Sequence, residues 1–134
     1  MAAFGVVYGW WGVWAVLFPR HFFDTFPGIG RQWTAAYPPY NEHLITDVGA
    51  TFLTLAFLLL AGAATRNRGV RAVALLAVAL FGALHLAFHI GHHGELGSAD
   101  LVTSLVALGL GVLVPLGLLI ADRRLGQRRA EGPS

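Results

Sequence analysis

Four of the six histidines lie in one nine-residue segment, His85 to His93, at the end of a long apolar run. An α-helix turns about 100° per residue, so His85, His89 and His92 fall within roughly 60° of one another, and His93 widens the arc to about 100°. Neutral imidazole is a strong ligand for transition metals and for haem iron, and helical spacing fixes its direction. This histidine segment therefore predicts a binding site, although its spacing names no reaction.

A second polar pair opens the preceding apolar run. Asn41 is a good N-cap and Glu42 suits the first turn of a helix, so helix initiation explains both residues. Helix initiation does not explain Asp47, which lies one turn beyond His43 on the same face. An ionisable residue in a segment that enters hydrocarbon is costly and is a functional candidate by default. We therefore predict that His43 and Asp47 share a site with the histidine segment.

Composition limits the class of protein. The 134 residues are 56% hydrophobic and 12% charged, against a usual charged share of about a quarter, which excludes an ordinary soluble domain. The apolar runs have the length of about 20 residues that a membrane helix needs, so we expect an integral membrane protein with one domain. The absence of cysteine excludes disulfides, zinc ribbons, iron–sulfur clusters and thiol catalysis. The only methionine is Met1, so a Cu(I) site is not expected.

These runs predict an all-α bundle of four transmembrane helices at about 2–18, 41–64, 70–90 and 101–121. The helices form a single domain, 1–121, followed by a polar cytoplasmic tail, 122–134. The outer loop, 19–40, is rich in proline and aromatic residues, which predicts an ordered segment at the headgroup level rather than a long helix. An anchored loop is the favoured interpretation, and a lid over a ligand is the alternative.

Arginine placement predicts the orientation. The turn at 65–71 and the tail contain most of the arginines, namely Arg66, Arg68, Arg71, Arg123, Arg124, Arg128 and Arg129. By the positive-inside rule both termini are cytoplasmic, and the histidines lie near the outer face of the cell membrane. A short turn joins the second and third helices, so we expect them to be antiparallel neighbours whose polar residues reach similar depths. The net charge of +2 is small and dispersed, which argues against nucleic acid as a partner.

The candidate site has two groups of residues. The predicted metal ligands are His43, His85, His89, His92 and Asp47. Glu42, His93 and Glu95 are predicted to orient those ligands or to relay protons. A Zn(II), Fe(II), Mn(II) or Cu(II) ion could use the first group. Haem b could take its axial ligands from facing helices, as His43 and His89. A proton or ion relay would need only the Asp and His residues and no cofactor. The spacing does not choose among these chemistries.

Two family resemblances bear on function. The histidine segment resembles the HxxxH and HxxHH boxes of membrane fatty-acid desaturases and hydroxylases, fused into one run. Those enzymes use several separated boxes around two irons, and this chain has one box, so the di-iron chemistry is not carried over. In its length, its four predicted helices and the Asp-Val-Gly-Ala motif at 47–50, the chain resembles the DoxX-like small bacterial membrane proteins. That resemblance implies a subunit associated with quinone-linked oxidoreductases, and it assigns no catalytic residue.

Three functional hypotheses follow. The first is a metal-dependent membrane enzyme or redox-associated subunit with the histidine and carboxylate residues as ligands. The second is a proton- or ion-coupled transport or binding component that uses the same residues. The third is an accessory subunit of a larger membrane complex, without a cofactor. The lipid bilayer is the expected partner, and a lipid or quinone-like ligand, a homo-oligomer and a larger complex stay open, as does enzymatic activity itself.

Overall fold

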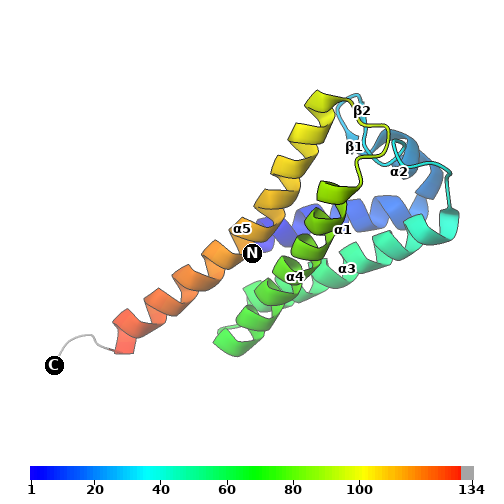
Figure 1. Ribbon diagram of the computed structural model, residues 1–134. Coiled ribbons are helices and arrows are strands. Elements are labelled where there is room, and N and C mark those ends of the chain that lie inside the picture. The colour runs from blue at the N-terminus through cyan, green and yellow to red at the C-terminus, as the bar shows by residue number, and fades with distance from the viewer. Residues whose placement is uncertain (131–134) are drawn as a thin grey trace.

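The computed structural model describes residues 1–130 and is helical apart from one small hairpin (Figure 1). The hairpin pairs two residues on each side in antiparallel register, with Pro27 opposite Gln32. The elements in chain order are α1 (Ala2–Leu17), α2 (Pro19–Thr25), β1 (Pro27–Gly28), β2 (Arg31–Gln32), α3 (Glu42–Ala64), α4 (Arg68–Gly91) and α5 (Ser98–Ala130). The expected all-α architecture is confirmed at this level.

Three helices, α3, α4 and α5, are long and apolar enough to cross a membrane. The first expected span is different, because α1 and α2 pass the same test only as a pair bent by 118°. Phe18 separates them in a non-helical conformation, and Pro19 begins α2. Proline disfavours the helical conformation in the residue before it but is well tolerated as the first residue of a helix. The proline therefore ends one helix and starts another, where the sequence predicted only a loop.

The helices form two antiparallel pairs rather than an even four-helix bundle. α1 packs along α3, and α4 packs along α5. Figure 1 shows α3 and α4 close together at their shared turn and diverging toward the other end, where α2 and the hairpin lie. Close packing of the first pair depends on Gly12 and Gly49, because a Cβ on Gly12 would come within 2.9 Å of the Gly49 carbonyl oxygen. Small residues of this kind let membrane helices approach closely.

Helix termini follow ordinary capping rules. The Asn41 side chain accepts a hydrogen bond from the Leu44 amide at 3.1 Å, which confirms its expected capping role. Asn67 caps α4 in the same way. α5 continues to Ala130, so residues 122–130 of the expected polar tail extend the last helix. Residues 131–134 of that tail lie outside the described residues.

Most buried side chains lie between α1, α2 and α3. Tyr8 of α1 meets Phe52 of α3 edge to face, with ring centroids 5.4 Å apart, and Phe22 of α2 is 1% exposed. In contrast, α4 and α5 leave long apolar faces uncovered. Only 17% of the most apolar 18-residue stretch of α5 is buried. Exposed apolar faces of this length suit contact with lipid chains.

Candidate functional site

The aromatic loop between α2 and α3 is docked onto the connector between α4 and α5. Asp100, in the first turn of α5, forms an ion pair with Arg31 of β2 and accepts a hydrogen bond from the Trp33 indole at 3.1 Å. Both charged side chains are partly exposed, at 35% and 38%. This contact holds the hairpin against the start of α5.

A second contact holds the loop against the end of α4. The Glu95 amide donates to the Ala36 carbonyl at 2.8 Å. Gly94 has φ +57°, and a Cβ there would overlap the Ala36 carbonyl oxygen and the Tyr37 ring. Two independent reasons therefore require glycine at this position: its positive φ, and the lack of room for a side chain.

Tyr37 links this loop to the histidine segment through a chain of hydrogen bonds. Its Oη lies 2.7 Å from His89 Nδ1, and His89 Nε2 lies 3.0 Å from His85 Nε2. The Tyr37 hydroxyl also donates its only hydrogen to the His92 carbonyl at 2.9 Å. The hydroxyl must therefore accept from His89 Nδ1–H, because a phenol has a single hydrogen to give.

This assignment fixes the tautomer of His89. When its Nδ1 carries the hydrogen, Nε2 of the neutral ring is left with a lone pair directed at His85. His85 can satisfy that lone pair by donating its own Nε2–H. All three hydrogen bonds then have the same direction. His85 donates to His89, His89 donates to Tyr37, and Tyr37 donates to the carbonyl at the end of α4.

Aromatic rings lie beside the chain of hydrogen bonds. Tyr37, His85 and His89 are each partly buried. The Phe81 ring lies 5.5 Å from that of His85, and the Phe88 ring lies 5.4 Å from that of His89. Burial also raises the pKa of the Tyr37 phenol above its ordinary value, so this hydroxyl keeps its hydrogen at neutral pH.

The other predicted ligands lie elsewhere. His43 and Asp47 are 3.4 Å apart on α3, but their side chains are 86% and 60% exposed. Within residues 1–130, no three His, Asp or Glu side chains converge closely enough to hold a metal ion. The expected convergence on α4 is not seen, because α3 and α4 diverge toward this end of the molecule (Figure 1). The predicted haem ligands, His43 and His89, stand near the diverging ends of these two helices.

The remaining candidates have local roles. His92 Nδ1 lies 3.1 Å from the Phe88 carbonyl oxygen, and His93 Nε2 lies 2.9 Å from that of Ile90, so both rings can bond to the end of their own helix. Glu42 is exposed and accepts from the Tyr40 hydroxyl at 3.5 Å. The Glu95 side chain is exposed, and it is the Glu95 amide that anchors the loop.

Sequence reasoning missed Tyr37, which is the polar partner of His89. The two residues are 52 positions apart, and no periodic pattern connects a loop residue to a helix face at that distance. Asp100 was missed in the same way, because its partners Arg31 and Trp33 come from the loop. The usable signal was the density of aromatic residues in the loop, which predicted order but not its contacts.

Comparison with family models, with curated proteins and with solved structures finds no match to this chain. The site must therefore be interpreted from its own geometry.

Proposed function

We propose that this chain is a multi-pass membrane protein that conducts protons, and that Tyr37, His89 and His85 form the first section of its proton path. The single observation that carries the proposal is the continuous set of hydrogen bonds from the loop to the interior of α4. Imidazole is suited to this task because it can accept a proton on one nitrogen and release one from the other. Ionisable residues inside a membrane helix commonly mark such paths.

The atoms allow a balanced transfer. A proton arriving at His85 Nδ1 makes that ring cationic, and His85 then passes its Nε2 proton to His89 Nε2. His89 releases its Nδ1 proton to Tyr37 Oη as the Tyr37 hydroxyl turns its own hydrogen away from the His92 carbonyl and gives it up to solvent. One proton enters and one leaves, and reorientation of the rings and the hydroxyl restores the starting arrangement. Transfer in the opposite direction uses the same atoms.

Proton flux into vesicles tests the proposal. Protein is reconstituted with a pH-sensitive dye inside the vesicles, and a potassium diffusion potential drives proton uptake. We expect faster acidification than in protein-free vesicles, and we expect His89→Gln and His85→Gln to return the rate to that background. His43→Gln and His93→Gln are matched controls, because they remove exposed imidazoles that are not part of the Tyr37–His89–His85 hydrogen bonds. Both variants should acidify the vesicles at the wild-type rate. Wild-type flux that survives both relay substitutions would refute the assignment.

A second candidate, the transition-metal site of a redox-associated subunit, is favoured by one specific distance. Two imidazole nitrogens bound to a tetrahedral metal at 2.0–2.1 Å lie about 3.3 Å apart. The Nε2 atoms of His85 and His89 are 3.0 Å apart and face each other, so a small opening of the pair would supply two of the four ligands of a tetrahedral Zn(II) ion. The Tyr37 hydroxyl would then hold His89 in the ligating tautomer.

Metal analysis distinguishes the two candidates. Protein is purified in mild detergent without chelator or histidine tag, and its metal content and absorption spectrum are measured. The metal candidate predicts near-stoichiometric metal that is lost in folded His85→Ala/His89→Ala protein, and a Soret band would select haem instead. Proton conduction by metal-free protein would support the relay and contradict the metal candidate.

A further inference from the structure

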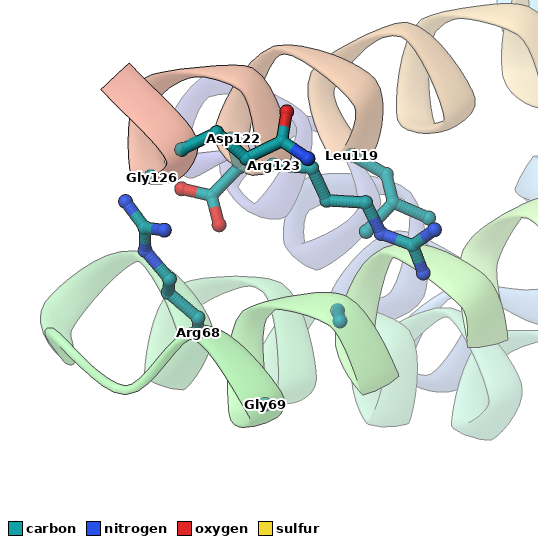
Figure 2. A pocket seen from close by; sticks show the side chains of 8 residues that line it. Arg68, Gly69, Leu119, Asp122, Arg123 and Gly126 are labelled. Atoms are coloured by element: carbon teal, nitrogen blue, oxygen red, sulfur yellow. The ribbon is translucent and has the colours of Figure 1, made fainter. Parts of the chain in front are cut away.

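A cleft lies between α4 and α5 at the end of the molecule opposite the docked loop. Figure 2 shows this cleft between the first turns of α4 and the last turns of α5. Its volume is about 500 Å³. The lining combines apolar and charged side chains, namely Arg68, Gly69, Ala72, Leu119, Asp122, Arg123, Gly126 and Gln127.

The charges around the cleft leave an excess of positive charge. Asp122 is the acidic residue of the lining, and its carboxylate already accepts from Arg71 at 2.7 Å. Neither Arg68 nor Arg123 forms an ion pair with another residue in the described part of the chain. Because Arg71 neutralises the charge of Asp122, the guanidinium groups of Arg68 and Arg123 are left to attract an anion.

Packing places one of these groups against the opposite helix. A Cβ on Gly126 would overlap the guanidinium of Arg68, so the absence of a side chain on α5 gives Arg68 its position. Figure 2 shows Arg68 reaching from α4 toward Gly126, while Arg123 extends from α5 along the cleft toward Leu119, so the two groups mark its two ends. Arginine presents several N–H donors in a fixed plane, which suits phosphate oxygens.

Apolar surface continues from the cleft along both helices. Ala72 and Leu119 line it, and Leu76, one turn beyond Ala72, and Ile120, next to Leu119, are exposed. A ligand that fits this surface has an anionic head and a hydrocarbon chain. Basic pockets between membrane helices recognise lipid headgroups of this kind.

We propose that the cleft between α4 and α5 binds the headgroup of an anionic phospholipid, with Arg68 and Arg123 attracting it from the two ends of the cleft and the exposed apolar faces of the two helices against its acyl chains. The site is separate from the Tyr37–His89–His85 chain and does not depend on its function.

Native mass spectrometry tests the proposal on the full chain in neutral detergent. The probes are phosphatidylglycerol and phosphatidylcholine with identical acyl chains. We expect wild-type protein to retain one phosphatidylglycerol with about tenfold preference, which corresponds to about 1.4 kcal/mol. Arg68→Gln/Arg123→Gln should abolish that preference. Arg66→Gln/Arg124→Gln removes the same charge from the same end outside the cleft lining, and it should keep the preference.

Two further arms make the result decisive. Gly126→Leu keeps every charge but displaces Arg68, so it should also lower the preference, and circular dichroism checks that each variant stays helical. Inorganic phosphate is added as a competitor at the concentration of the lipid, and it should not displace the lipid. The proposal is overturned if phosphate alone binds as well, if the control pair loses as much preference, or if wild-type protein does not distinguish the two lipids.

Discussion

The Tyr37 hydroxyl and the His89 imidazole meet at 2.7 Å, and this contact joins a loop residue to a residue of α4 that lies 52 positions later in the chain. Tyr37 gives its own hydrogen to the His92 carbonyl, so it serves His89 as an acceptor. One phenol therefore sets the tautomer of the central histidine and holds the loop on the end of α4.

Replacing Tyr37 by Phe should release that tautomer. His89 Nδ1–H loses its acceptor, and an unsatisfied buried polar group costs about 1–3 kcal/mol, with the lower end expected here because His89 is only partly buried. Nitrogen NMR of labelled histidine should show His89 shifting toward a mixture of tautomers, with a lower unfolding midpoint. Tyr40→Phe is the control, since its hydroxyl makes one long contact of 3.5 Å with exposed Glu42. An unchanged His89 spectrum in Tyr37→Phe would contradict the hydrogen-bond assignment.

Gly94→Ala should undock the loop. The substitution adds a Cβ at positive φ and against the Ala36 carbonyl, so we expect a loss of about 1–3 kcal/mol in docking free energy. Hydrogen exchange of the Glu95 amide, which donates to Ala36, should accelerate. Gly97→Ala provides the comparison, because nothing lies within 4 Å of a Cβ there, and its exchange should match that of the wild type. Equal protection in both variants would count against the packed loop.

Asp100→Asn should loosen the hairpin to a smaller degree. The Arg31–Asp100 pair is more than a third exposed, so solvent screening limits its contribution to about 1 kcal/mol or less. Trp33 loses its carboxylate partner and should show a shifted fluorescence maximum, and high salt should produce part of the same shift in wild-type protein. Asp24→Asn, which breaks the exposed Arg20–Asp24 pair, should leave the spectrum unchanged. A salt-independent spectrum would argue against the ion pair.

Loop docking should weaken at alkaline pH. Burial raises the pKa of Tyr37 above the ordinary value of 10.0, so the folded state favours the neutral phenol. The stabilisation is therefore fully present below pH 10.0 and is lost as pH rises through the raised pKa, where the phenolate can no longer donate to the His92 carbonyl. Tyrosinate absorbance should show a component above pH 10.0 that is missing in Tyr37→Phe. A Tyr37 component at or below the ordinary value would refute the expected sign.

Gly12→Ala should separate α1 from α3. Its Cβ would lie 2.9 Å from both the Gly49 carbonyl oxygen and the Leu53 amide, and backbone atoms cannot move aside as a flexible side chain can. Overpacking of this kind typically costs about 1–3 kcal/mol. Gly9→Ala, on the same helix, meets only Ala56 at 3.7 Å, so thermal unfolding should show little loss or a small gain. Equal melting temperatures of the two variants would contradict the packing described for this pair.

The sequence predicted the helices well because hydrophobic length and capping are local properties. Asn41 caps α3 as expected. The last three predicted apolar runs correspond to α3, α4 and the first part of α5. The bend after Leu17 was not predicted, because proline is compatible with both a loop and the start of a helix.

The candidate site was predicted only within single helices. The one-turn spacing paired His85 with His89 and His43 with Asp47, and both pairs are present. Whether two helices bring such pairs together depends on their rotation and crossing angle, which tertiary packing decides. Here the loop is held on the end of α4, so its own Tyr37, rather than a residue of α3, reaches His89.

The divergence of the two helix pairs gives the loop a mechanical role. Its hairpin is fastened to α5 through Asp100, Tyr37 is fastened to α4, and Asn41 caps α3. The loop therefore connects the ends of α3, α4 and α5 on the side where α3 and α4 diverge, opposite the turn that joins them (Figure 1). Because Tyr37 contacts both His89 and the His92 carbonyl, a change in the angle between the two pairs would strain these hydrogen bonds.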